Sequence, residues 1–258
     1  MTITLETGWL AGTPVEDTLL RRYLHNQADL NALLAAAGGG EVVRDPAAVL
    51  TWYATPVVFL NQAVLLQPPT DQVLDEVDRF YAGRSATLLS AWPTPDLTAR
   101  GWQLMGHPTF VARGPQPVVP SAAAGVAVAA AQTAADLALA ERLAVEGYPV
   151  PAAAGAPANS VFPAGLLGSA FTVRLGHLDG RAVSVAASHV SRGVLNLCLA
   201  ATLPQGRRRG VWEALAQARL ADAPHLPAAA TTSDLSRAGF EKLGFLPVTR
   251  LTMWVRDG

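Results

Sequence analysis

The sequence contains a single cysteine, Cys198, among 258 residues, so no intramolecular disulfide can form. Residues 1–20 lack the basic start and the apolar run of a secretory signal. No stretch of the chain reaches the roughly 18 uninterrupted apolar residues that a membrane-spanning helix requires. These absences predict a protein of the reducing cytoplasm with no membrane partner.

Several ligand classes also lack their usual signals. The five histidines are scattered without the spacing of metal ligands, so no metal is expected. The net charge of −1 argues against nucleic acid as the main partner, because binding to phosphate backbones needs a broad basic face. The sequence has no G-x-x-x-x-G-K-[ST] and no G-x-G-x-x-G after an early strand, which excludes the usual nucleotide enzymes.

The composition is that of a folded protein, with 50% hydrophobic and 15% charged residues. A chain of this length can form one large domain or two small ones. The proline-rich segment 114–121 lies between two apolar-periodic regions and is the best candidate for a linker. We therefore expect two domains, at residues 1–116 and 117–258.

Residues 200–215 predict a strand that ends in a basic, glycine-bearing turn, which opens directly into a helix at Gly210. The turn carries three consecutive arginines, at 207–209. The N–H groups at a helix start and the positive end of the helix dipole favour a multiply charged anion. The pattern indicates a phosphate site, although an arginine run taken alone is more often a solvated surface.

The second half has the alternation of a mixed α/β fold. Turns at Asp179-Gly180 and Arg192-Gly193 predict hairpins between three successive strands. The expected elements are a strand at 126–130, a helix ending near Gly147, strands at 170–175, 182–189 and 194–203, a helix at 210–221, a strand at 228–232, a helix from Ser236, and a strand pair at 246–256.

Two motifs in this half resemble one known family. Residues 207–212 follow the pattern [QR]-x-x-G-x-[GA] except at the last position, Trp212, and residues 233–245 are similar to a helix that ends in Y-E-K-L-G-F, with Phe240 in place of the tyrosine. In this order and spacing they resemble the GCN5-related N-acetyltransferases (GNATs) over about residues 125–258. The resemblance implies the α/β (α+β) acyl-CoA N-acyltransferase fold, a mixed central sheet flanked by helices.

The first half repeats part of the second. Residues 100–113 align with residues 243–256, and Gly, Thr and Arg coincide at a constant offset of 143. A strand at 57–66, a helix at 71–81 and a strand at 87–92 precede the first copy in the same order. We interpret the first half as a degenerate copy of the fold, although three matches in fourteen positions can also arise by chance. Its loop at 66–71 has no arginine or glycine and two prolines, so we expect no coenzyme A there.

The resemblance implies a set of site residues. Three residues are candidates for catalytic roles, either as the general base or in place of the family's asparagine: His189, Glu146 and Ser233. Those implied to contact acetyl-CoA are Ala200, Ala201, Thr202, Arg207, Arg208, Arg209, Gly210, Val211, Trp212, Glu213, Ser233 and Phe240. A histidine at a strand end is more often structural than a base. Tyr148 and the segment 149–165 lie where the family places its acceptor-lining loop, which can act as a lid.

The resulting hypothesis is an acetyl-CoA-dependent N-acetyltransferase without a metal, which transfers the acetyl group directly to a small-molecule amine or a peptide. Phe240 has no proton to give to the departing thiolate, so a catalytically silent module that binds CoA or acyl-CoA is the alternative. A third interpretation is that the arginines dock a protein or another phosphorylated ligand. Either a monomer or a homodimer is expected.

Overall fold

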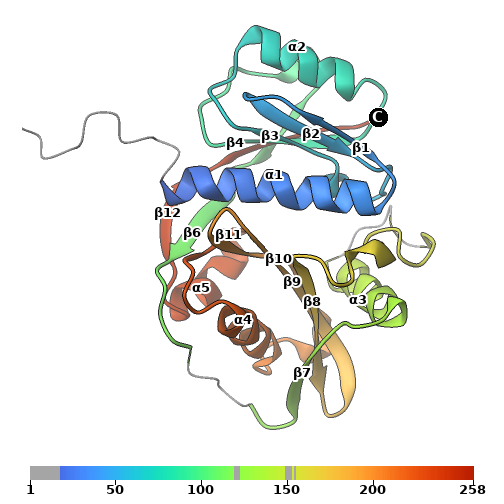
Figure 1. The fold of residues 1–258 in the computed structure, drawn as a ribbon, viewed down its shortest axis with the longest axis vertical. Helices are drawn as coiled ribbons and strands as arrows, with labels where there is room; N and C mark the ends of the chain where they lie inside the picture. Colours follow the sequence, from blue (N-terminus) through green and yellow to red (C-terminus); the bar gives the residue numbers. More distant parts are fainter. Residues whose placement is uncertain (1–17, 119–122, 149–152, 154) are drawn as a thin grey trace, which may run out of the picture.

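The computed structural model describes residues 18–118, 123–148, 153 and 155–258. These residues form two mixed β-sheets, and the helix α1 (Leu19–Ala37) lies between them (Figure 1). The first sheet has the strand order β1-β2-β3-β4-β13-β5, and the second has the order β12-β6-β11-β10-β9-β8-β7. The predicted fold class, mixed sheets flanked by helices, is confirmed.

The boundaries of the elements follow. The strands of the first sheet are β1 (Glu41–Arg44), β2 (Ala48–Trp52), β3 (Gln62–Leu65), β4 (Ala86–Ser90), β5 (Gln103–Gly106) and β13 (Thr252–Arg256). The strands of the second sheet are β6 (Thr109–Arg113), β7 (Val126–Ala130), β8 (Phe171–Leu178), β9 (Arg181–Ser191), β10 (Val194–Thr202), β11 (Ala228–Thr232) and β12 (Leu246–Arg250). The other α-helices are α2 (Asp71–Phe80), α3 (Ala134–Gly147), α4 (Val211–Asp222) and α5 (Asp234–Lys242). Short 3₁₀ helices are η2 (Val58–Leu60), η3 (Thr98–Arg100), η5 (Ala164–Leu166) and η6 (Pro204–Gly206).

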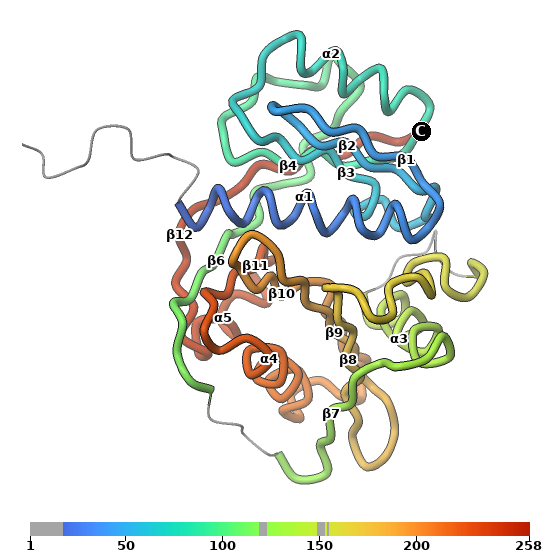
Figure 2. The backbone as a smooth tube through the Cα atoms, viewed as in Figure 1, coloured from blue at the N-terminus to red at the C-terminus, as the bar shows by residue number. Residues whose placement is uncertain are grey.

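The two halves exchange their last strands. β6, from the first half, lies between β11 and β12 in the second sheet, and β13, from the second half, lies between β4 and β5 in the first sheet. Figure 2 shows the exchange as a green strand that enters the lower sheet and the red end of the chain that enters the upper one. The repeat seen in the sequence is β5–β6 and β12–β13, whose last strands coincide residue for residue at the offset of 143.

The connection between β12 and β13 favours the exchange because it is shorter than a common hairpin loop, whereas β5 and β6 are joined by two residues, His107 and Pro108. Leu251, which is fully buried, is the one residue between β12 and β13, and the commonest hairpin loops need two residues. Its N–H donates to the carbonyl oxygen of Pro108 at 2.9 Å. Pro108 is the corresponding residue in the first copy, so the two connections meet where the halves cross.

Two expectations change as a result. Both strands of the pair predicted at 246–256 are present, as β12 and β13, but they lie in different sheets and do not pair with each other. The boundary between residues 116 and 117 stays a prediction, but each sheet is completed by a strand from the other side of it. Part of the linker, residues 119–121, and part of the lid, residues 149–152 and 154, lie outside the described residues.

Helix α1 joins the sheets through buried amides. Asn26 Nδ2 donates to the carbonyl oxygens of Ser191 and Val194 in the second half, both at 3.0 Å. On the other side, Asn31 Nδ2 donates to Gln62 Oε1 at 2.9 Å in β3. These polar residues interrupt the apolar stripe that a helix of this kind usually shows, and the sequence analysis did not predict the helix.

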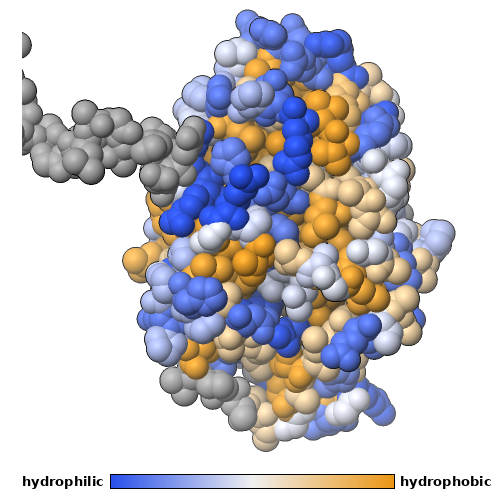
Figure 3. Space-filling view, in the orientation of Figure 1, coloured by the Kyte–Doolittle hydropathy of each residue, from blue (hydrophilic) through white to orange (hydrophobic). Residues whose placement is uncertain are grey.

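Strongly hydrophilic residues gather over the N-terminal part of α1, whereas more apolar residues lie toward its C-terminal end (Figure 3). Asp29 accepts from Arg44 of the first half at 3.1 Å and from Arg192 of the second half at 2.7 Å. Partial burial tends to raise the pKa of Asp29, but the hydrogen bonds and charges of the two arginines outweigh it and hold this pKa below its ordinary value. One carboxylate therefore ties both halves to the helix.

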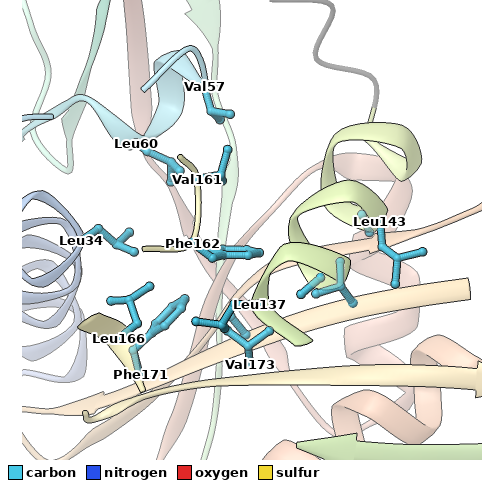
Figure 4. Packing of buried hydrophobic residues seen from close by; sticks show 14 of the residues in the cluster. Leu34, Val57, Leu60, Leu137, Leu143, Val161, Phe162, Leu166, Phe171 and Val173 are labelled. Carbon is cyan, nitrogen blue, oxygen red and sulfur yellow. The ribbon is translucent and has the colours of Figure 1, made fainter. Parts of the chain in front are cut away.

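The largest core cluster also draws on both halves. Figure 4 shows Leu34 of α1 and Leu60 of η2, from the first half, beside Phe162, Leu166 and residues of β8 and α3 from the second. Such close packing over a shared apolar surface makes the two halves one hydrophobic unit.

Most local predictions for the second half are confirmed. The turns at Asp179-Gly180 and Arg192-Gly193 have positive φ at both residues, as the two-residue hairpin turns require. In the first half, the strand expected at 57–66 is a 3₁₀ turn followed by the shorter β3. Within the described residues, no helix has both the length and the apolar character needed to cross a membrane.

Candidate functional site

The predicted phosphate loop connects β10 to α4. Arg208 and Gly210 have φ of 61° and 78°, so the chain turns sharply just before the helix. Gly210 is the N-cap residue and provides no side-chain cap, which leaves the N–H groups of Val211, Trp212 and Glu213 without partners inside the helix. Together with the helix dipole, these donors favour a negatively charged group at the start of α4.

A cavity of about 390 Å³ opens at this loop. It lies between the first turn of α4 and helix α5, and Lys242 adds a cation at its edge. Its described lining residues are Thr202, Gly206, Arg207, Arg208, Gly210, Val211, Trp212, Glu213, Leu235, Ser236, Gly239, Lys242 and Leu243. The structure thus brings seven of the predicted acetyl-CoA contacts together at this cavity.

The three arginines occupy different places. Arg207 is held by the protein itself, because its Nε donates to the carbonyl oxygen of Thr202 at 3.1 Å and its Nη2 to that of Gly147 at 3.2 Å. Arg208 is exposed and lines the cavity, whereas Arg209 is exposed and is not among its described lining residues. Arg208 is therefore the arginine best placed for a ligand.

A second cavity, also of about 390 Å³, lies where β10 and β11 diverge. The two strands pair in parallel only at Leu195–Ala228 and Asn196–Ala229. Beyond these pairs the register of β10 shifts between Cys198 and Ala201, and Leu199 has a φ of 48°. The opening that results extends from α4 and α5 toward α3 and η2.

Residues from both halves line the second cavity. The described set comprises Val57, Phe59, Leu60, Ala144, Val145, Tyr148, Val161, Phe162, Leu197, Cys198, Leu199, Ala200, Ala201, Trp212, Arg219, Thr231, Ser233, Ser236 and Phe240. Figure 4 shows Val57, Leu60, Val161 and Phe162 converging on one region of this wall. Trp212 and Ser236 also line the first cavity, so the two cavities adjoin.

Aromatic packing fixes the border between the cavities. The ring of Trp212 meets Phe240 edge-on at a centroid distance of 5.1 Å, and Phe240 meets Phe245 in the same way at 5.2 Å. A Cβ on Gly239 would lie 2.9 Å from the Trp212 ring, so the helix needs glycine there. The indole of Trp212 therefore turns toward α5 and leaves the backbone N–H groups of α4 free.

Ser233 lies at the N-cap of α5 and forms part of the second cavity. Its Oγ is 3.1 Å from Ser236 Oγ, so the two hydroxyls share a hydrogen bond at the wall. Ala200 and Ala201 line the same cavity, and Thr202 lines the first one. These predicted residues are thus brought together along one continuous opening.

The two predicted base candidates lie elsewhere. Glu146 is exposed on α3 and His189 is buried in β9 beneath α1, and neither is among the described lining residues of the two cavities. Burial lowers the pKa of His189, and this effect outweighs the charge of Asp29 and the backbone carbonyl of Ala170, which raise it. Among the described residues around the second cavity there is no carboxylate and no histidine.

Cys198 also lines the second cavity, but its chemistry is that of a core residue. Burial raises the pKa of its thiol to about 12, although the charge of Arg219 acts in the opposite direction. At neutral pH the thiolate is therefore scarce, and the thiolate is the reactive form.

Arg219 was missed by the sequence analysis. It is fully buried on α4 and lines the second cavity, where it is the charged residue among the described lining set. Burial lowers its pKa to about 10, so it remains a cation at neutral pH. A signal was present, since Val211, Leu215 and Arg219 follow the i, i+4, i+8 spacing of one helix face and the first two are apolar.

The loop of the first half differs from this site. Thr70 caps α2 by accepting from the Val73 N–H at 3.3 Å. The first turn of α4 has no such side-chain cap, so its N–H groups remain available to a ligand. Pro68 and Pro69 have no N–H to offer. In the described residues, no three side chains of the metal-ligating type gather in either half.

Comparison with solved structures identifies the fold. A GCN5-related N-acetyltransferase from Kribbella flavida has 20% identity and a TM-score of 0.67, covering 94% of this chain and 97% of that one. An acetyltransferase of the GNAT family from Novosphingobium aromaticivorans has 13% identity and a TM-score of 0.57, covering 91% and 99%. A tandem GNAT protein from the clavulanic acid biosynthesis pathway has 16% identity and a TM-score of 0.51, covering 91% and 94%. No family model and no curated protein matches the sequence.

These likenesses define the chain as a protein of the GNAT fold. The structure carries that fold in two halves, as in the tandem protein, with their last strands exchanged. The predicted fold and the predicted relation of the first half to the second are confirmed.

Proposed function

We propose that the chain is an acetyl-CoA-dependent N-acetyltransferase whose second half binds the thioester. The observation that carries this proposal is the continuity of the two cavities, one at the free N-terminus of α4 and the other between the diverging strands β10 and β11. An elongated ligand with a polyanionic end and an acyl end fits this arrangement. GNAT-fold neighbours support an acyl-CoA as that ligand.

The residues of the first cavity suit the pyrophosphate. The N–H groups of Val211, Trp212 and Glu213 and the side chain of Arg208 supply hydrogen bonds and positive charge to it. Pantetheine would then follow β10 past Thr202, Ala201 and Ala200 to the second cavity. The pairing of β10 with β9 is interrupted between Cys198 and Ala201, and we infer that a backbone N–H of this segment donates to the thioester oxygen, on which negative charge develops during transfer.

The reaction itself balances without a further reactant. The lone pair of a neutral amine attacks the thioester carbonyl carbon and a C–N bond forms. The C–S bond then breaks, and CoA leaves as the thiolate. One proton moves from the amine nitrogen to solvent and one from solvent to the thiolate. Because Phe240 replaces the family's tyrosine, solvent supplies the second proton. The acceptor is a small-molecule amine or a peptide.

One observation favours the alternative, a silent module that binds CoA or acyl-CoA. The described wall of the second cavity contains no carboxylate or histidine to deprotonate an amine. Release of free thiol from acetyl-CoA with a panel of amines separates the two. Thiol release above the rate without amine supports the enzyme, whereas tight binding without any release supports the silent module.

The binding step has its own test, the thermal unfolding midpoint with and without acetyl-CoA. At about 100 times its dissociation constant a ligand adds about 2.7 kcal/mol to the free energy of unfolding, which raises the midpoint by several degrees. We expect Arg208→Glu to weaken binding at least about tenfold and Arg209→Glu, the matched control, to weaken it less. A wild-type midpoint that acetyl-CoA does not move would refute the proposal.

A further inference from the structure

The wall of the second cavity contains a buried guanidinium without a counter-ion. Arg219 Nε donates to the carbonyl oxygen of Leu215 at 3.2 Å, and Nη1 donates to that of Ala187 at 2.8 Å. Nη2 is buried and has no hydrogen-bond partner in the described part of the chain. Arg219 forms no ion pair with a carboxylate of the described residues, and Asp222, whose charge raises the pKa of Arg219, pairs with Arg174.

Structural needs explain only part of this arrangement. Next to the register shift in β10, Nη1 donates to the carbonyl oxygen of Ala187 in β9 and approaches that of Cys198 at 3.5 Å. A neutral donor would do the same without the cost of burying a charge. The charge and the free Nη2 remain unexplained by the protein alone.

The residues around Arg219 indicate which kind of ligand it would bind. Leu197, Leu199 and Phe240 line the same cavity as Arg219, so an anion there is held in a mostly apolar environment in which its attraction to the guanidinium is strong. Nη2 has two N–H donors, and the hydroxyl of Ser233 lines the cavity as well. The phosphates of CoA are accounted for by the first cavity, which leaves a carboxylate as the group that fits here.

We propose that Arg219 binds a carboxylate of the substrate, so that the second cavity selects a ligand with an apolar stem and a carboxylate. The inference rests on the proposed function. The carboxylate belongs either to the acyl group, as in the CoA monothioester of a dicarboxylic acid, or to the acceptor, as in an α-amino acid. Both sources present the same chemistry to Nη2, and the experiment separates them.

The test compares ligand pairs that differ by one carboxylate, using calorimetric titration of the full-length protein. In the donor arm the ligands are succinyl-CoA and butyryl-CoA. In the acceptor arm the protein is saturated with CoA and titrated with leucine or with 3-methylbutylamine. We expect a preference of about tenfold or more for the carboxylated member in one arm, since a charge-assisted hydrogen bond in an apolar site is strong.

Variants assign that preference to the residue. Arg219→Met, which keeps the volume of the side chain, should abolish it, and Arg219→Lys should keep part of it. Arg174→Met is the matched control, because Arg174 is a neighbouring arginine paired with α4 that lines neither cavity in the described residues, and it should leave the preference unchanged. Should Arg219→Met fail to fold, Arg219→Lys decides the assignment: a preference that this variant leaves at the wild-type value would refute the role of the guanidinium.

The outcomes separate the inference from the proposed function. If acetyl-CoA binds but neither arm shows a preference, the carboxylate site is refuted and the acetyltransferase proposal stands. If the preference survives in Arg219→Met, another residue is responsible and the assignment fails. If no CoA thioester binds at all, the proposed function fails and this inference fails with it.

Discussion

Separating the halves tests the strand exchange most directly. We expect residues 117–258, expressed alone, not to form the native fold, because they lack β6. In the intact protein β12 pairs with β6 and β11 pairs with β6 on its other side. Without this strand, β12 has no neighbour among the described strands and β11 becomes an exposed edge.

The magnitude follows from burial. Phe110 and Val111 of β6 are 1% and 0% exposed. Burying each such side chain contributes about 1.5–3 kcal/mol, so these two account for about 3–6 kcal/mol before the ladder hydrogen bonds are counted. The free energy of unfolding of a whole domain is about 5–15 kcal/mol. Loss of β6 therefore removes a large part of the stability of the second sheet.

The assay is cooperative unfolding in urea, followed by tryptophan fluorescence, of fragment 1–116, of fragment 117–258 and of the two co-expressed. Each fragment alone should lack a cooperative transition, and the co-expressed pair should purify as a complex that has one. A monomeric fragment 117–258 with the unfolding midpoint of the intact chain would show that β13 can replace β6 and that the exchange is not required.

Three further results are expected. Asp29→Asn should lower the free energy of unfolding by about 1 kcal/mol or less at pH 7, since both ion pairs are partly exposed. Because folding lowers the pKa of Asp29, this stabilisation is present above the unfolded-state pKa and is lost as the pH falls through the folded-state pKa. The urea midpoints of parent and variant should therefore converge in acid, and a gap that stays constant with pH would contradict the assignment. Cys198 should resist iodoacetamide at pH 8 in the native protein and react on unfolding in urea, as its raised pKa requires. Rapid alkylation of the native protein, measured by mass spectrometry, would contradict the raised pKa. Gly210→Val should lower the thermal unfolding midpoint and abolish the rise in midpoint that acetyl-CoA gives, because φ is 78° at Gly210 and a Cβ would lie 2.9 Å from the Cβ of Ala123. Gly83→Val is the control, since Gly83 also has a positive φ but no atom lies near the position of an added Cβ. This control should lower the midpoint and keep the rise that acetyl-CoA gives.

The features that the sequence predicts well are local ones. The glycine turns of the meander and the start of α4 depend on residues within a few positions of each other, and the structure has them where the pattern places them. The repeat at offset 143 predicted a second copy of the fold. It did not predict that the copies exchange strands, because either partner gives β6 and β13 the same buried environment.

Contacts between distant segments account for the rest. The buried amides of Asn26 and Asn31 take their partners from strands far along the chain, so α1 has no simple apolar stripe in the sequence. Arg219 donates to carbonyl oxygens of β9 and β10, two strands that precede α4 in the chain, and no local pattern in the sequence predicts those partners. His189 has the residue type of a catalytic base, but the packing of α1 over β9 buries it away from the cavities.

The two halves have diverged in a way that makes the first half part of the site of the second. Its own helix start is closed by the Thr70 cap and two prolines, whereas Val57, Phe59 and Leu60 form a wall of the cavity between β10 and β11. A change in these apolar residues would alter that cavity without touching the anion site at α4. We therefore expect the first half to determine which group is accepted beside the thioester, and the strand exchange to hold it in place for that role.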